Sequence, residues 1–151
     1  MGSNTRAVLG SFMDAVCFQY LRINTEETAG RAPIVSAGRK RGYELIESLG
    51  LMGSNPEASV IQAKLDAALG ANGTRLCLIT SITRNANGSY EVRLVECACT
   101  MGQTSTEPLC AFTLGVFIGA LHAISGTRMT GRETACQAMG APECIYQIEP
   151  I

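Results

Sequence analysis

Three cysteines and one glutamate in the C-terminal third of the chain are residue types that suit a zinc ion: Cys110, Glu133, Cys136 and Cys144. Zinc prefers thiolate sulfur, accepts a carboxylate oxygen, and in closed structural sites binds four ligands at tetrahedral corners. Glu133 precedes Cys136 by three residues, which is one turn of a helix, and a Gly-Ala-Pro turn can bring Cys144 back toward both. The four residues therefore suggest one metal site.

Cys110 lies 23 positions before Glu133, in the first turn of a helix that we expect to open with Thr106, Glu107 and Pro108. The helix dipole and the free backbone amides at such a position favour an anionic thiolate. An alternative is that these cysteines are buried small hydrophobic residues, which is where free cysteine is usually found. Spacing alone leaves both interpretations open, because it is not the doubled C-x2-C pattern of a zinc ribbon.

The segment from Cys110 to Ile148 resembles the 4-vinyl-reductase-type small-molecule-binding domain. The resemblance rests on Gly131, the E-T-A-C run that starts at Glu133, Gly140 and the closing C-I-Y-Q-I strand, and it extends more diffusely over most of the chain. In the sensor members of that family the equivalent positions hold a structural zinc. The resemblance therefore implies zinc on Cys110, Glu133, Cys136 and Cys144, joining the C-terminal strand and turn to the central helix.

The same resemblance implies a fold and a class of ligand. The fold is an antiparallel sheet with helices packed on it, shared with subunits of a vesicle-tethering complex (TRAPP), and commonly a homodimer. Members of the family are associated with chlorophyll-type tetrapyrrole metabolism and with sensing of aromatic hydrocarbons.

The composition predicts a single domain that spans residues 1–151. Its 46% hydrophobic content can build a core, while a net charge of -1 and a pI near 5.8 give no reason to expect nucleic acid as a partner. Seven cysteines without a secretory leader favour a reducing, cytoplasmic environment. The longest apolar run, Ala111 to Ile124, is too short to cross a bilayer of roughly 30 Å, so we expect a buried helix and no transmembrane segment.

Hydrophobic periodicity predicts the α+β class, with an antiparallel sheet against which N-terminal helices and a central apolar helix pack. The N-A-N-G sequence at 85–88 predicts a hairpin turn. The expected elements are helices at 5–22, 34–49 and 55–70 with a polar loop at 24–33, strands at 75–83 and 90–100, a helix at 107–125, a strand at 128–131, a helix or turn at 133–139, and a strand at 144–148.

A ligand pocket is expected between the first helices and the sheet. Aromatic and apolar side chains could line it, and Arg39, in a basic cluster, could pair with the propionates of a tetrapyrrole. The same residues could instead hold the helices on the core or form a solvated helix face. The candidate ligand-binding residues are Phe12, Val16, Tyr20, Arg39, Tyr43 and Phe117.

Enzymatic chemistry has little support in the sequence. There is no dinucleotide-binding, P-loop or serine-hydrolase motif, and His122 is the only histidine. A zinc ion with four protein ligands also has no open position for water. We therefore expect a non-catalytic carrier, sensor or photosynthesis-related assembly domain for a tetrapyrrole of chlorophyll or bilin type, with a possible protein partner that receives the cargo.

Three alternatives remain open at this stage. The chain could sense aromatic hydrocarbons, or act as an assembly factor or scaffold through protein contacts alone. It could also be a thiol-dependent enzyme that uses Cys97, Cys99 or Cys136.

Overall fold

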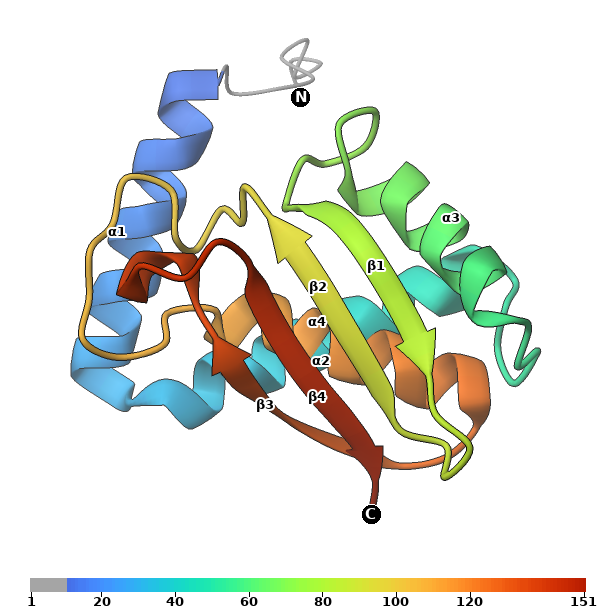
Figure 1. The fold of residues 1–151 in the computed structure, drawn as a ribbon. Coiled ribbons are helices and arrows are strands. Elements are labelled where there is room, and N and C mark those ends of the chain that lie inside the picture. Colours follow the sequence, from blue (N-terminus) through green and yellow to red (C-terminus); the bar gives the residue numbers. More distant parts are fainter. Residues whose placement is uncertain (1–10) are drawn as a thin grey trace, which may run out of the picture.

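A computed structural model describes residues 11–151, with side chains described from residue 17 onward. Four helices, four strands and one 3-10 helix follow one another along the described chain (Figure 1). The elements are α1 (Ser11–Ala29), α2 (Arg31–Ser48), α3 (Ala58–Leu69), β1 (Leu78–Arg84), β2 (Tyr90–Val95), α4 (Ala111–Ser125), β3 (Met129–Ala135), η1 (Gln137–Met139) and β4 (Cys144–Pro150). The predicted α+β class is confirmed.

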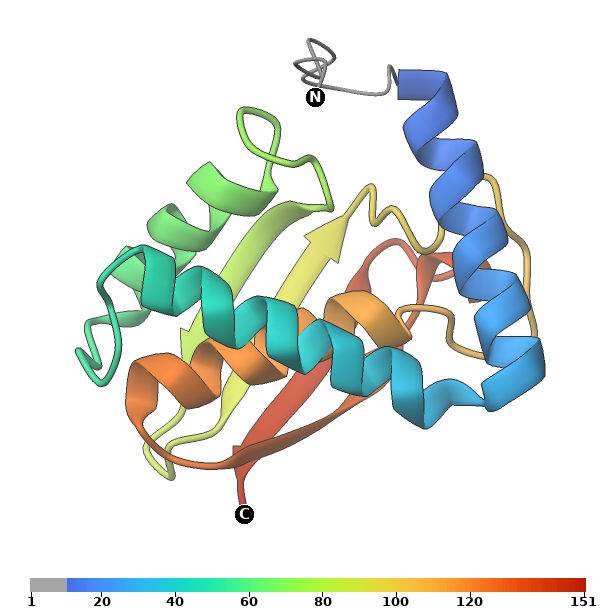
Figure 2. The same cartoon turned by 180° about the vertical axis from the view of Figure 1, so that it is seen from behind.

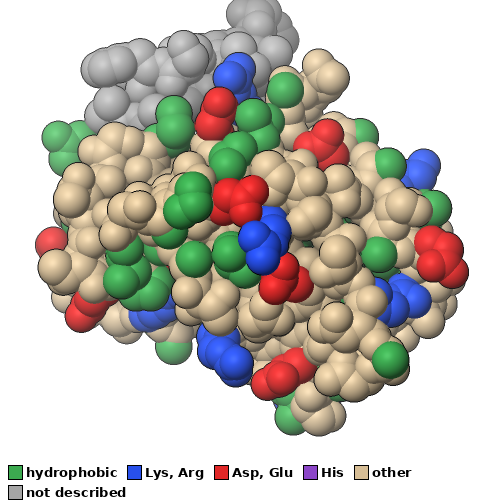
Figure 3. Space-filling model, in the orientation of Figure 1, with side chains coloured by type: hydrophobic (Ala, Val, Ile, Leu, Met, Phe, Trp, Pro, Cys, Tyr) green, Lys and Arg blue, Asp and Glu red, His purple; other side chains and the backbone are tan. Residues whose placement is uncertain are grey.

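The strands form one antiparallel sheet in the order β1-β2-β4-β3. The predicted β1–β2 hairpin turns at 85–89, where Gly88 adopts φ +82° and the Asn85 amide donates to the Ser89 carbonyl at 2.8 Å. Along β2, buried residues alternate with half-buried ones, so one face of the sheet carries the core and the other faces solvent. On the solvent face acidic and basic side chains lie close together (Figure 3), and Arg93 forms ion pairs with Glu91 and Glu143.

Helix α4 is the central apolar helix of the molecule, as predicted. It lies between the sheet and α2 (Figures 1 and 2), and 12 of its 15 residues are buried. Gly42 of α2 lies so close to α4 that a Cβ atom there would be 1.9 Å from the Val116 carbonyl oxygen, and a Cβ on Gly119 would be 2.0 Å from the Arg39 carbonyl oxygen. Glycines on both helices therefore allow the two backbones to touch.

The other two helices cover the margins of this core. Helix α3 packs beside the edge strand β1 (Figure 1), where the Gln62 side chain accepts a hydrogen bond of 2.9 Å from the Ile82 amide. Helix α1 packs Phe18 edge-on against Phe112, with ring centroids 5.9 Å apart, and Gln19 donates a hydrogen bond to the carbonyl of Ala98. No helix within residues 11–151 is long and apolar enough to span a membrane.

The predicted polar loop at 24–33 is wrong, because α1 continues to Ala29 and α2 begins at Arg31. The hydroxyls of Thr25 and Thr28 donate to carbonyls one turn earlier, at 2.6 and 2.7 Å, so the polar residues occupy exposed positions of a regular helix. Gly30, at φ +84°, makes the break between the two helices. The part of the predicted first helix before residue 11 lies outside the described residues.

Two predicted elements in the second half of the chain also need correction. Glu133 is not helical but extended, because it pairs with Tyr146 across β3 and β4, and only Gln137–Met139 form a short helix. Strand β2 ends at Val95 rather than at residue 100, since Glu96 takes φ +50° and turns the chain. Helix α4 begins after Cys110, which is its N-cap rather than part of its first turn.

Candidate metal centre and adjoining cavity

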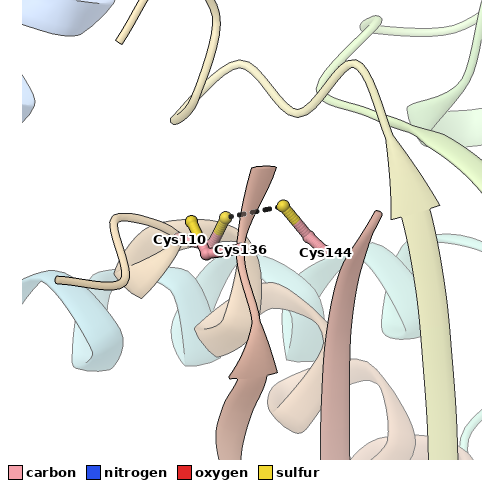
Figure 4. Close-up of side chains that lie close together, drawn as sticks. All are labelled: Cys110, Cys136 and Cys144. Carbon is pink, nitrogen blue, oxygen red and sulfur yellow. Dashed lines mark hydrogen bonds between the residues drawn. The ribbon is translucent and has the colours of Figure 1, made fainter. Parts of the chain in front are cut away.

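Three of the four predicted metal ligands converge in the core. The Sγ atoms of Cys110, Cys136 and Cys144 all lie within 4.8 Å of one another, and the three residues are buried (Figure 4). Cys110 Sγ and Cys144 Sγ are 3.6 Å apart, the contact that is dashed in Figure 4. Ligands about 2.3 Å from a tetrahedral zinc would lie about 3.8 Å from one another. The three thiols therefore have the spacing of ligands that share one metal ion.

Three separate elements bring these thiols together. Cys110 caps α4, Cys136 follows β3, and Cys144 begins β4. The turn between the last two is tight: Gly140 adopts φ +93°, and the Gln137 amide donates to Cys144 Sγ at 3.3 Å. Both the helix start and the turn have to be formed before the site exists.

The thiols influence one another's protonation. Hydrogen bonds from Cys110 and Cys144 lower the pKa of the Cys136 thiol, and donation to Cys136 raises the pKa of Cys110. Burial and the same neighbour raise the pKa of Cys144 to about 12, although the Cys110 hydrogen bond opposes the rise. The cluster thus favours one thiolate at Cys136, the form that binds a metal ion.

The Glu133 carboxylate lies outside the group of three thiols and forms an ion pair with Arg31 through Oε1. Its side chain is 1% exposed, and Oε2 is buried without a hydrogen-bond partner among the described residues. Burial raises the pKa of Glu133 to about 7, Arg31 opposes the rise, and the nearby Cys136 and Cys97 thiols add to it. A buried carboxylate oxygen without a partner beside three thiols is the kind of group that a metal ion would satisfy.

Arg31 links two of the segments that carry predicted ligands. At the start of α2, its Nη2 pairs with Glu133, and its Nη1 donates to the Pro108 carbonyl oxygen at 2.9 Å. Pro108 is two residues before Cys110. The guanidinium therefore connects β3 to the segment that leads into α4.

Two further thiols adjoin the cluster. Cys97 Sγ is 3.7 Å from Cys110 Sγ, and Cys97 and Cys99 both contact the Thr113 hydroxyl, at 3.2 and 3.3 Å. Their placement depends on the turn at Glu96. The sequence prediction of one strand face for both missed their contact with α4.

A cavity of about 780 Å³ lies next to the metal-ligand candidates. Residues from α1, α2, β3, the start of α4 and the segment before it line the cavity. They include four carboxylates, two arginines and several apolar side chains: Glu26, Glu27, Arg31, Val35, Glu107, Pro108, Leu109, Leu114, Gly131, Arg132 and Glu133. Arg31 and Glu133 thus belong both to the cavity wall and to the surroundings of the thiols.

The cysteine-rich part of the chain matches a known domain family. Residues 90–150 match the family model of the vinyl-4-reductase domain. This segment is a vinyl-4-reductase-type domain. The predicted resemblance is confirmed, and the match covers Cys110, Glu133, Cys136 and Cys144. A comparison with curated proteins gave no match.

Solved structures support the same fold for the whole described chain. The phenol-responsive sensory domain of the transcription activator PoxR, with phenol, has a TM-score of 0.69 and 19% identity, covering 96% of this chain and 77% of that one. A vinyl-4-reductase family protein from Methanocaldococcus jannaschii has a TM-score of 0.62 and 13% identity, covering 97% and 85%. A trafficking protein particle complex subunit 3 from Naegleria fowleri, covalently bound to palmitic acid, has a TM-score of 0.56 and 14% identity, covering 93% and 91%. At these identities the likeness shows the fold, and the predicted kinship with vesicle-tethering subunits is confirmed at that level.

Most of the predicted ligand-binding residues lie apart from one another. Phe117 is buried in the core, edge-on to Tyr146 with centroids 6.0 Å apart, while Tyr43 lies edge-on to His122 at 5.4 Å. Tyr20 is 65% exposed, and Arg39 is half-buried on α2. None of these four predicted residues (Tyr20, Arg39, Tyr43 and Phe117) lines the 780 Å³ cavity. The side chains of Phe12 and Val16 lie outside the described residues.

Sequence reasoning missed the residues that do line the cavity of this vinyl-4-reductase-type fold. Glu26 and Arg31 fall in the segment that was predicted to be a loop, and Leu109 and Leu114 were assigned only to a buried helix region. Their convergence depends on the packing of α1 and α2 around the start of α4. No local pattern in the sequence signals it.

Proposed function

We propose that this chain is a non-catalytic binding domain, with a sensor or carrier role, for an apolar or aromatic small molecule, and that its C-terminal segment is joined to the core by zinc. The observation that carries the proposal is the shared boundary of the cavity and the thiol cluster at Arg31 and Glu133. The similarity of fold to a phenol-responsive sensory domain and to a vinyl-4-reductase family protein supports a binding role.

For the metal, we propose that zinc is held by Cys110, Cys136, Cys144 and Glu133. The unpaired Oε2 of Glu133 supports the carboxylate as fourth ligand, because Oε1 is already bound by Arg31. Ligating carboxylates are commonly hydrogen-bonded in this way by an outer group. A zinc ion with these four ligands would be structural, joining the start of α4 to the β3–β4 turn.

For the ligand, the charges around the cavity favour an aromatic molecule with few negative groups. Four carboxylates and two guanidinium groups line it, so a molecule with several carboxylates would meet net repulsion. The cavity volume is within the range of about 300 to 1,000 Å³ that is typical of small-molecule sites. A tetrapyrrole of chlorophyll or bilin type remains a candidate, because Arg31 and Arg132 could pair with its propionates.

Native mass spectrometry of protein purified from its own host, with zinc analysis and a visible spectrum, tests this function. We expect one zinc per chain and an additional organic mass. Pigment absorbance would identify a tetrapyrrole, and its absence together with a smaller aromatic mass would identify an aromatic ligand. A metal-free chain without any bound molecule would contradict the proposal.

A scaffold that acts through protein contacts is the second candidate, and α1 provides the observation for it. Tyr20 and Leu21 on this helix are 65% and 69% exposed, which is unusual for large apolar side chains that lie next to each other. The predicted homodimer, cytoplasmic location and cargo-receiving partner are likewise proposals. If sedimentation shows a dimer that Leu21→Glu dissociates, α1 is an interface; an unchanged dimer would place the interface elsewhere.

A further inference from the structure

Arg31 holds together the two segments that approach the thiols from opposite directions. Its guanidinium pairs with Glu133 on β3 and donates to the Pro108 carbonyl oxygen at 2.9 Å, two residues before Cys110. Both acceptors are engaged by one rigid, planar group, so the position of Glu133 relative to the start of α4 is restricted by a side chain from α2.

The same side chain forms part of the cavity wall. Arg31 is 40% exposed, whereas its partner Glu133 is 1% exposed. The ion pair therefore crosses from the cavity into the buried cluster. Burial of Glu133 makes the pairing consequential, because a buried carboxylate without a counter-charge is strongly unfavourable.

Arg132 provides a natural comparison within the same cavity. It is the residue before Glu133 and lines the same wall, but its ion pair is with Glu149 at 3.9 Å, and both of those side chains are more than half exposed. Exposed pairs of this kind contribute little to structure. A difference between variants of Arg31 and Arg132 would thus reflect contacts with the metal-ligand segments rather than the charge of the cavity.

We infer that Arg31 is a positioning residue of the zinc site and that it links zinc binding to the cavity wall formed by the start of α2. The inference rests on the proposed zinc site. Through the contacts of Arg31, zinc would fix Glu133 and the segment before Cys110, and this order would extend to the first turn of α2. Because coupling of two binding events is reciprocal, any occupant of the cavity that displaces Arg31 would weaken zinc binding.

The first test measures zinc affinity by competition with a chromogenic chelator, using Arg31→Gln, Arg31→Lys and the control Arg132→Gln. We expect a loss of about 10- to 100-fold for Arg31→Gln, the usual effect of removing an outer-shell partner. Arg31→Lys should recover only part of the affinity, because an ammonium group does not provide the planar fork, and Arg132→Gln should match the parent protein. Equal affinities for Arg31→Gln and Arg132→Gln would overturn the inference.

The second test measures hydrogen exchange of the backbone amides at 31–38 with and without zinc. Zinc should slow exchange there in the parent protein and in Arg132→Gln, and should have no effect there in Arg31→Gln. Protection by zinc that persists in Arg31→Gln would contradict a link through this side chain. If Arg31→Gln does not fold, as judged by circular dichroism, Arg31→Lys serves for both tests. A parent protein that binds no zinc would instead refute the proposed metal site, so the two failures are distinguishable.

Discussion

Helix α4 meets its neighbours in two opposite ways. Along its middle, α4 meets α2 through glycines on both helices, with backbone against backbone and no side chains between them. At its start, α4 meets β3 and β4 through thiols, a buried carboxylate and a buried phenol, and two of these polar groups lack a partner within the described structure. The comparison suggests that the glycine contact specifies the fold, whereas the polar corner is kept for binding.

The glycine contact should be the most sensitive place in the molecule. In Gly42→Ala the new methyl group would lie 1.9 Å from the Val116 carbonyl oxygen, so α2 and α4 would have to separate. We expect a loss of about 4 kcal/mol or more in the free energy of unfolding, or no folded protein. Gly50→Ala is the control: Gly50 has φ +69° and no neighbour within 4 Å, so it should lose only about 1 kcal/mol in urea denaturation. Equal effects of the two variants would refute the close contact.

The polar corner should give the metal-free protein an unusual dependence on pH. Glu133 has a pKa of about 7 in the folded state, raised by burial from an ordinary 4.5. Between these values the unfolded chain releases a proton that the folded chain retains, so stability is greatest below pH 4.5 and falls as pH rises to 7. The difference between the two pKa values corresponds to about 3 kcal/mol.

Urea denaturation of metal-free protein at several pH values between about 4.5 and 8 measures this effect. Glu133→Gln is the control, because it removes the titrating group and should remove most of the slope in that interval. If the parent protein and Glu133→Gln show the same pH dependence, the buried carboxylate is not its source.

The buried hydroxyl of Tyr146 should have an effect of opposite sign to that of a matched tyrosine. Tyr146 Oη is buried without a partner among the described residues, and Tyr90, equally buried, accepts a hydrogen bond from Arg84 Nε at 2.9 Å. Tyr146→Phe should therefore stabilise the metal-free protein by about 1 kcal/mol, and Tyr90→Phe should destabilise it by a similar amount. Thermal unfolding of both variants is the measurement. Destabilisation by Tyr146→Phe would mean that its hydroxyl has an unrecognised partner.

Cys97 separates the metal ligands from neighbouring thiols, with the smallest expected effect. Cys97 Sγ contacts Cys110 Sγ at 3.7 Å but does not belong to the group of three thiols. Cys97→Ala should keep one zinc per chain in elemental analysis, whereas Cys110→Ala should lose it. Loss of zinc from Cys97→Ala would make Cys97 a ligand.

Local sequence signals predicted the elements whose patterns are short and self-contained. The apolar run after Cys110 became the central helix, and N-A-N-G became the hairpin turn. The cysteine spacing and the resemblance of the segment from Cys110 to Ile148 identified the thiols that converge. These features depend on residues that are close in sequence or shared with a family.

The features that the sequence did not predict depend on distant packing. Residues 24–33 are polar enough for a loop, yet helical hydrogen bonds and exposure keep most of them in α1 and α2. Glu133 has helical spacing to Cys136, but pairing with β4 makes it extended. Arg31 is 102 residues from Glu133, and no local pattern could show that they meet.

X-ray absorption at the zinc edge of the purified protein tests the central claim most directly, because it counts the sulfur and oxygen ligands of the bound metal. Zinc held by Cys110, Cys136, Cys144 and Glu133 predicts three sulfur ligands at about 2.3 Å and one oxygen ligand at about 2.0 to 2.2 Å. Four sulfur ligands would replace Glu133 by another thiol, and a protein without zinc would contradict the account of this corner as a metal centre.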